Sequence, residues 1–197
     1  MLTLNIEDVE KLSIELSQMV ETVPELVAYV AKGSYLIGQT LSDIFKVPLL
    51  EIETERSGSR LKDLASPFLR LLPNRLKLWL RKKELNTGVH ANYSERYAVI
   101  NSSNKLLEHD FRTILLVDDS VDTGNTILAT KKILKKSFPN ANISTAAFVV
   151  FEASKSLVKI DYSLFNDKII SAPWSRDSKY YREFLHKYEE MKIAGII

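Results

Sequence analysis

Short apolar runs alternate with segments of helical periodicity along most of the chain, and this alternation limits the fold more than any other feature of the sequence. Strands joined by helices in this order form a parallel sheet with helices on both faces. We therefore expect an α/β fold with an open, mostly parallel twisted sheet. The expected strands are residues 25–31, 47–53, 97–100, 113–118 and 143–151, with 168–172 as a further candidate. The expected helices are residues 5–22, 34–45, 126–137 and 175–191.

The length and composition indicate one domain with an interruption. A chain of 197 residues, of which 45% are hydrophobic, can bury a sizeable core, and we expect a single domain over 1–197. The alternation of strands and helices stops at 56–96, where apolar positions at helical spacing are combined with an excess of basic residues. We expect this segment to be a basic helical insertion into the domain.

The composition also excludes several kinds of site. Without cysteine the chain cannot form disulfides, use thiolate catalysis or bind zinc through cysteine, and its histidines, His90, His109 and His186, lack metal-ligand spacing. Residues 1–12 place acids where a secretion signal would be basic, and no apolar run reaches the roughly 18 residues that span a bilayer. We expect a cytoplasmic protein. A net charge of +2 is too small by itself to indicate nucleic-acid binding.

The stretch 113–127 is the most informative short segment, because an apolar run leads directly into acids. We expect the strand to end at Val117, which would leave Asp118, Asp119 and Asp122 exposed just beyond it. Ligands of open α/β sheets bind at the carboxyl ends of the strands. Adjacent carboxylates suit a ligand with vicinal hydroxyls, or a divalent cation held by oxygen atoms.

A small polar turn follows the acids and leads into a predicted helix; it consists of Thr123, Gly124, Asn125 and Thr126. The N-terminus of a helix offers free backbone N–H groups and a positive dipole end, both of which favour phosphate. A phosphorylated sugar would satisfy the turn and the acids together. The simpler alternative is a solvated turn in which one residue caps the helix.

These residues carry a family resemblance. "ILLVDDSVDTGNT" resembles the signature of type I phosphoribosyltransferases, which use phosphoribosyl pyrophosphate (PRPP) and Mg²⁺. "VAYVAKGSYLIGQTLSDIFKVPLLEI" is similar to the first β-α-β unit of the hypoxanthine-guanine members. In that unit Lys32, Gly33 and Ser34 match a pyrophosphate-binding loop, and the resemblance implies a cis peptide bond, expected here between Lys32 and Gly33. The similarity covers most of 23–52 and 97–177 and implies the fold of that family.

The resemblance also implies roles for the matching residues. The turn after the acids would hold the 5′-phosphate, and Asp118 and Asp119 would contact the ribose hydroxyls and Mg²⁺. Asp122 matches the residue that serves as the proposed general base in the oxopurine-using members. Lys32 would join Mg²⁺ and backbone amides in stabilising the negative charge that develops on the departing pyrophosphate.

A small C-terminal hood is expected at 152–180, where "KIISAPWSRD" resembles the bacterial xanthine-guanine members. The resemblance places Ile169 at the position that stacks on the base and Ile170 at a backbone contact. It places Trp174 behind them, although Trp174 could also stack on the base or simply pack in the core. Asp177 is a candidate for a second Mg²⁺ contact, with a helix cap as the alternative.

Glu152 lies where oxopurine-using members place a lysine that binds the 6-oxo group. A buried Glu152 carboxylate would place one hydrogen-bond acceptor against another, the 6-oxo group of the base. Leaving a buried polar group without a partner costs roughly 1–3 kcal/mol of binding free energy. We therefore expect hypoxanthine and guanine to be disfavoured against a base that offers an amino or N–H group.

Three interpretations of the insertion 56–96 remain open. It could be a helical cap on the core or on a second subunit, which fits an expected homodimer and is the interpretation that we favour. It could be a basic amphipathic surface for an anionic membrane or a partner. It could also contact nucleic acid or attract a polyanionic substrate.

Two classes of function follow. The first is an Mg²⁺-dependent enzyme that transfers ribose 5-phosphate from PRPP to a purine-like base and releases pyrophosphate. The second is a PRPP-sensing regulator whose insertion binds RNA, a membrane surface or a protein. The presence of both the Lys32 loop and Asp122 favours the enzyme, because a sensor needs a phosphate-binding turn but no proton acceptor.

Overall fold

The computed structural model describes residues 2–56, 96–101, 104–176 and 178–193. Helices and strands alternate along most of this part of the chain. In order, the elements are β1 (Leu2–Thr3), α1 (Ile6–Met19), β2 (Leu26–Val30), α2 (Tyr35–Phe45), β3 (Leu49–Arg56), β4 (Arg96–Val99), the 3₁₀ helix η2 (Lys105–Glu108), β5 (Thr113–Val121), α5 (Asn125–Ser137), β6 (Asn142–Val150), the 3₁₀ helix η3 (Glu152–Ser154), β7 (Tyr162–Asn166), β8 (Ile170–Ser171) and α6 (Tyr181–Ile193).

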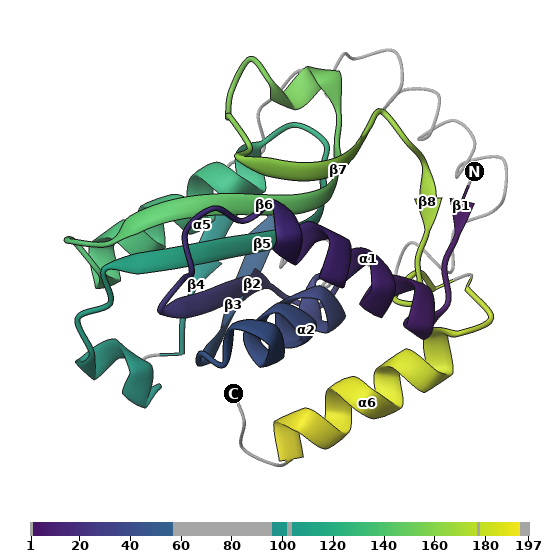
Figure 1. The fold of residues 1–197 in the computed structure, drawn as a ribbon, viewed down its shortest axis with the longest axis horizontal. Coiled ribbons are helices and arrows are strands. Elements are labelled where there is room, and N and C mark those ends of the chain that lie inside the picture. The colour runs from purple at the N-terminus through teal and green to yellow at the C-terminus, as the bar shows by residue number, and fades with distance from the viewer. Residues whose placement is uncertain (1, 57–95, 102–103, 177, 194–197) are drawn as a thin grey trace, which may run out of the picture. The chain divides into compact units, whose positions relative to one another are not determined.

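The main sheet has six strands in the order β4-β3-β2-β5-β6-β7 (Figure 1). The pairings of β2 with β3 and β5, of β5 with β6, and of β6 with β7 are all parallel. β1 and β8 form a separate two-stranded parallel sheet. The expected α/β fold with an open, mostly parallel sheet is confirmed.

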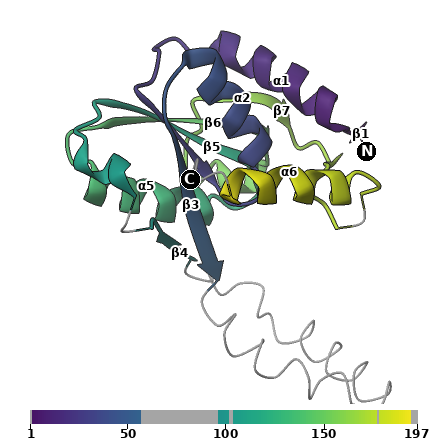
Figure 2. The same cartoon turned by 90° about the horizontal axis from the view of Figure 1, so that it is seen from below.

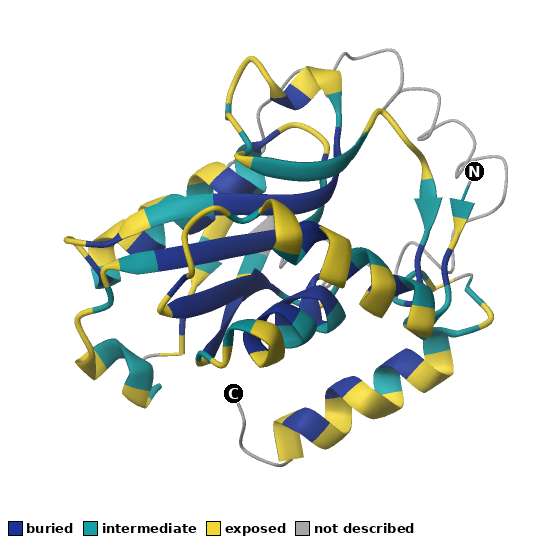
Figure 3. Ribbon diagram, viewed as in Figure 1, coloured by how far each residue is buried: buried dark blue, intermediate teal, exposed yellow. Residues whose placement is uncertain are grey.

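Apolar side chains cover both faces of this sheet. On one face, α1, α2 and α6 contribute residues such as Leu16, Ile37 and Phe184 to a single buried cluster. On the other face, α5 contributes Ile127 and Leu134 to a second cluster. Figure 2 shows α5 and the pair α1 and α2 on opposite sides of the sheet, and Figure 3 shows that the central strands are almost wholly buried. The carboxyl ends of the strands therefore project from a rigid, packed layer.

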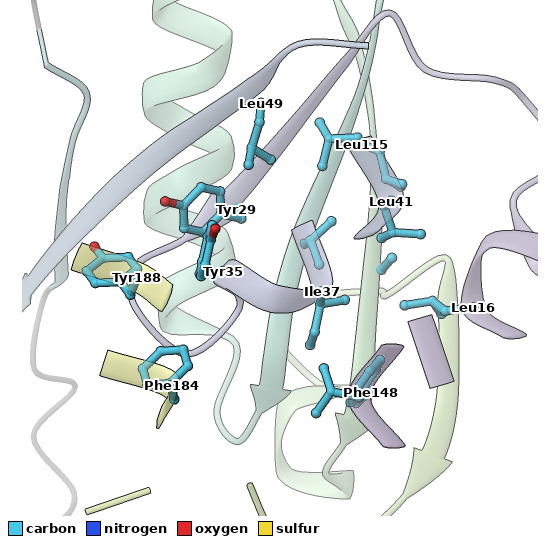
Figure 4. Packing of buried hydrophobic residues seen from close by; sticks show 14 of the residues in the cluster. Leu16, Tyr29, Tyr35, Ile37, Leu41, Leu49, Leu115, Phe148, Phe184 and Tyr188 are labelled. Carbon is cyan, nitrogen blue, oxygen red and sulfur yellow. The ribbon is translucent and has the colours of Figure 1, made fainter. Parts of the chain in front are cut away.

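Aromatic residues link α6 to the centre of the first cluster. Figure 4 shows Tyr188 and Phe184 of α6 beside Tyr29 of β2 and Tyr35 of α2. The Tyr188 ring lies edge-on to Tyr35, with 5.4 Å between the ring centroids. The Tyr188 hydroxyl donates a hydrogen bond to the buried Glu51 carboxylate. Burial and the neighbouring Glu51 raise the pKa of Tyr188, so the tyrosine stays protonated as the donor.

Close backbone approach between β2 and α2 depends on a glycine. A Cβ atom at Gly38 would lie 2.9 Å from the Cβ of Tyr29 and 3.3 Å from Leu49 Cδ1. Because Gly38 has no side chain, α2 can lie directly on the strand that leads into the predicted pyrophosphate loop.

Two features of the sheet differ from the sequence-based expectation. β5 continues past Val117 to Val121, and its last residues pair with β6 through Ser120 opposite Val149 and Val121 opposite Val150. β7 was not expected, because Tyr162–Asn166 is a half-buried edge strand and lacks a continuous apolar run. The candidate strand at 168–172 is present as the short β8.

The contacts divide the chain into two compact units, Met1–Thr54 with Ala98–Ile197, and Glu55–Tyr97. The second unit falls almost wholly outside the described residues, and so does the expected helical insertion at 56–96. Within the described part of the chain, no helix combines the length and the apolar character needed to cross a membrane.

Candidate active site

The paired acids lie within β5 and not beyond its end. Asp118 is only 5% exposed, and its Oδ1 accepts hydrogen bonds from the Ser34 hydroxyl at 3.1 Å and from the Asp119 amide at 2.9 Å. The expectation of an exposed Asp118 is therefore wrong. The reason is that β5 is an inner strand, paired with β2 and β6, and it extends past the acids.

Burial controls the protonation of both acids. It raises the pKa of Asp118 well above the usual carboxyl value, and the negative charge of Asp119 raises it further. Burial also raises the pKa of Asp119, but a hydrogen bond from Trp174 works in the opposite direction. The buried Asp118 carboxylate and the half-buried Asp119 carboxylate next to it repel each other, and hydroxyl donors or a cation would relieve that repulsion. The pair is therefore suited to a ligand that brings one or both.

The Asp119 carboxylate is enclosed by two neighbours. Its Oδ2 accepts a hydrogen bond from the Trp174 indole N–H at 2.5 Å. On another side, a Cβ atom at Gly33 would lie 2.9 Å from the same oxygen and 3.2 Å from Trp174 Nε1. The predicted pyrophosphate loop, the acids of β5 and the hood therefore meet at one point.

The loop after β2 contains the cis peptide bond implied by the resemblance, but one residue earlier than expected. The cis bond joins Ala31 to Lys32, so the expectation of a cis bond between Lys32 and Gly33 is wrong. The Lys32 ammonium lies 5.4 Å from the centroid of the Tyr188 ring. Ser34, at the N-terminus of α2, makes no side-chain capping bond and donates its hydroxyl to Asp118 instead.

The turn after β5 has the geometry expected of an anion site. Gly124 has a φ of +84°, and a Cβ there would lie 2.6 Å from Val158 Cγ2, so both the backbone and the packing require glycine. α5 begins at Asn125, whose side-chain amide donates to the Thr123 hydroxyl at 3.1 Å, and its first turn contains no acid. The N–H groups of this first turn lack partners within the helix and favour an anion.

A cavity of about 180 Å³ opens between β5, β6 and the hood. Of the residues predicted for the site, those that line it are Asp119, Asp122, Ile169, Ile170 and Trp174. Asp122 is exposed and accepts a hydrogen bond from the Ser120 hydroxyl at 2.9 Å. The cavity therefore lies beside the acids of the signature segment.

Glu152 does not line this cavity. Its side chain is 73% exposed and pairs with Lys155 at 2.6 Å. The expectation of a buried Glu152 carboxylate facing the base is wrong, because β6 ends at Val150 and the chain turns outward in η3. Asp177 lies outside the described residues.

Lys168 lines the cavity and was not predicted as a site residue. Its ammonium lies 4.0 Å from the centroid of the Phe165 ring, and the residue is exposed. The sequence feature that could have indicated Lys168 is its place directly before Ile169, the predicted stacking position in "KIISAPW". The end of β6 has no lysine, and Glu152 is the charged residue that follows it in the sequence.

A family model described as the phosphoribosyl transferase domain matches residues 3–180. The chain belongs to the phosphoribosyltransferase family. The resemblance stated from the sequence is thereby confirmed, and so is the enzyme class. No curated protein sequence matches this phosphoribosyltransferase significantly.

Solved structures share the fold of this phosphoribosyltransferase over nearly its whole length. The xanthine-guanine-hypoxanthine phosphoribosyltransferase of Helicobacter pylori has a TM-score of 0.64 at 20% identity, covering 92% of this chain and 98% of that one. The purine phosphoribosyltransferase of Pyrococcus horikoshii has a TM-score of 0.58 at 19% identity, with 90% and 95% covered. A hypothetical protein from Neisseria gonorrhoeae with bound ppGpp has a TM-score of 0.59 at 15% identity, with 96% and 97% covered.

Proposed function

We propose that this phosphoribosyltransferase transfers ribose 5-phosphate from PRPP to a purine-like base at the cavity beside Asp119, with the help of Mg²⁺. One observation carries the proposal: the Ser34 hydroxyl of the pyrophosphate loop is hydrogen-bonded to Asp118 of the signature strand. This contact brings two segments 84 residues apart into one site. The cavity adjoins that site through Asp119.

The 5′-phosphate, the ribose and the pyrophosphate of PRPP would each contact protein groups that can bind them. The 5′-phosphate would bind the turn that begins α5, where Gly124 and the free N–H groups accommodate an anion. The ribose hydroxyls would donate to Asp118 and Asp119. The pyrophosphate would lie on the loop formed by Lys32 and Gly33.

The donor set fits Mg²⁺. This ion takes one or two protein carboxylates and completes its shell with water and substrate phosphate oxygens, so Asp118 and Asp119 suffice on the protein side. Bound Mg²⁺ would neutralise charge on the departing pyrophosphate.

In the transfer, the bond from the ribose carbon C1′ to pyrophosphate breaks and a bond from C1′ to a base nitrogen forms. A base that reacts through an N–H group must lose its proton. Asp122 lines the cavity and carries a carboxylate that can accept this proton. Lys32 would stabilise the negative charge that pyrophosphate gains.

Lys168 favours a base with a hydrogen-bond acceptor. It is the charged donor on the hood side of the cavity, whereas Asp122 supplies an acceptor. Because Glu152 is exposed and paired to Lys155, its carboxylate no longer disfavours hypoxanthine and guanine, and only the aliphatic Ile169 at the stacking position still does. An oxopurine that places its oxo group toward Lys168 and its N–H toward Asp122 would satisfy both.

The test is pyrophosphate release from PRPP and Mg²⁺ with hypoxanthine, guanine, xanthine, adenine and orotate in turn. We expect turnover with at least one oxopurine, loss of PRPP binding in the double variant Asp118→Asn and Asp119→Asn, and unchanged binding in the control Glu152→Gln. Unchanged PRPP affinity in the double variant would refute the site.

The second candidate is a regulatory protein that binds a phosphorylated purine compound without turning it over. The neighbour from Neisseria gonorrhoeae was solved with bound ppGpp, which makes such a nucleotide the ligand to try. Tight binding of ppGpp together with no pyrophosphate release from PRPP and any base of the panel would favour this function over the transferase.

A further inference from the structure

Trp174 has a role that the function proposed above does not require of it. We infer that Trp174 is a positioning residue whose indole N–H orients Asp119 for PRPP. This inference rests on the proposed site, since it assigns the ribose of PRPP to Asp119.

The hydrogen bond between Trp174 and Asp119 is short and directional. The indole Nε1 lies 2.5 Å from Asp119 Oδ2, and an indole N–H can only donate, so the carboxylate must accept. Hydrogen bonds to ionised acceptors are about twice as strong as neutral ones. The bond to Trp174 holds the carboxylate in one orientation toward a ligand hydroxyl or a cation.

Space around Asp119 Oδ2 is also limited by the backbone of Gly33, which lies next to the indole N–H. A Cβ atom on Gly33 would stand 2.9 Å from Asp119 Oδ2 and 3.1 Å from its Cγ. The glycine backbone and the tryptophan donor therefore both crowd the same carboxylate oxygen. Loss of the donor would free the carboxylate to rotate, although the glycine would still limit its movement.

Trp174 is itself held in place. Its ring lies edge-on to Phe184 of α6, with 6.1 Å between the centroids and an interplanar angle of 60°. Phe184 is 1% exposed and belongs to the main hydrophobic cluster. The donor therefore rests on the core of the molecule, which makes it a fixed reference for the Asp119 carboxylate.

A stacking role for Trp174 would predict different behaviour. Trp174 also lines the cavity, so a base could contact its ring. Replacement by phenylalanine removes the N–H donor and leaves a smaller aromatic ring with less area for stacking. A residue that stacks on the base would then change the KM for the base, whereas a residue that orients Asp119 would change the KM for PRPP.

The experiment compares Trp174→Phe with the wild type and with Asp119→Asn by titration of PRPP and Mg²⁺ and by steady-state kinetics. We expect PRPP affinity to fall about tenfold or more in Trp174→Phe, as for the loss of one hydrogen bond to a charged group. The KM for PRPP should rise, and the KM for the base should change less than threefold, roughly the smallest effect of one net hydrogen bond.

A spectroscopic measurement tests the contact directly. The sequence has two tryptophans, so a Trp79→Phe background leaves Trp174 as the single indole N–H signal in a ¹⁵N-labelled sample. We expect that signal to move when Asp119→Asn is introduced and again when PRPP and Mg²⁺ are added. A signal that stays in place with Asp119→Asn would overturn the inference, even if Trp174→Phe fails to fold.

Different results would overturn the role of Trp174 and the proposed PRPP site. Wild-type PRPP affinity in Trp174→Phe, together with lost affinity in Asp119→Asn, would overturn the role of Trp174 and leave the proposed function intact. Unchanged affinity in both variants would refute the assignment of Asp119 to PRPP, and the inference with it.

Discussion

Gly33 and Gly38 leave equally little room for a Cβ atom, but Gly33 adjoins the proposed PRPP site and Gly38 lies in the core. A Cβ at Gly33 would come 2.9 Å from Asp119 Oδ2, and one at Gly38 would come 2.9 Å from Tyr29 Cβ. Ordinary van der Waals contact begins at 3.4 Å, so each substitution by alanine requires a displacement of about 0.5 Å. We predict that Gly33→Ala impairs PRPP binding and that Gly38→Ala impairs folding.

At Gly33 the atom that must move is the end of a side chain. Asp119 can shift, but only by weakening its hydrogen bond with Trp174, whose Nε1 would itself lie 3.2 Å from the new methyl group. A hydrogen bond to a charged group contributes roughly 1.5–3 kcal/mol, which corresponds to about a tenfold to hundredfold loss of PRPP affinity. Gly33 does not have a positive φ, so alanine adds no backbone strain there.

At Gly38 the contact is with the base of a buried tyrosine in the core. Overpacking a core typically costs about 1–3 kcal/mol of unfolding free energy, which would lower the Tm by a few degrees to about 10 °C. Calorimetric Tm values and PRPP titrations on both variants separate the two effects. Wild-type PRPP affinity in Gly33→Ala would refute the argument that Asp119 is confined by the loop.

Two further predictions concern single side chains of the site. Because burial raises the pKa of Asp118, its charged form destabilises the folded protein above that pKa. Without PRPP or divalent cations, Asp118→Asn should therefore raise the Tm at pH 7. This gain in Tm should shrink as the pH falls toward the usual carboxyl range. A gain that grew toward low pH in thermal melts would contradict this sign. Lys168→Ala should raise the KM for an oxopurine roughly three- to tenfold, the effect of one ordinary hydrogen bond, while the KM for PRPP stays unchanged. Equal KM values for the base in Lys168→Ala and wild type would show that Lys168 does not contact it.

Features with a local cause could be predicted from the sequence. The apolar run of β2, the helical spacing of α2 and the apolar run of β3 give a β-α-β unit from neighbouring residues alone. The turn at Gly124 was also predictable, because a positive φ and the start of a helix both depend on a few adjacent residues. These features placed the predicted phosphate turn and the acids at the same end of the sheet.

Features that depend on distant packing could not be predicted. Asp118 and Asp119 interrupt an apolar run and suggest a strand end, yet the pairing with β6 continues through Asp118 to Val121. The contact between Trp174 and Asp119 spans 55 residues and exists only because the hood folds back over the strand ends. The sequence alone does not show how the hood folds. The prediction therefore assigned the base pocket to Glu152, the polar residue directly after β6, and missed Lys168, which lines the cavity.

The small sheet of β1 and β8 links residues 2–4 to the wall of the cavity beside Asp119. Leu2 N–H donates to Ile169 O at 3.1 Å, and Leu4 N–H donates to Ser171 O at 2.9 Å. Ile169 and Ile170, which line the cavity, are thus hydrogen-bonded or paired with residues that a purification tag would adjoin. A tag fused next to β1 is therefore expected to alter the measured base preference, which would then reflect the tag as well as the enzyme. Carrying the tag on the far side of a cleavage site, and comparing base preference before and after its removal, separates the two.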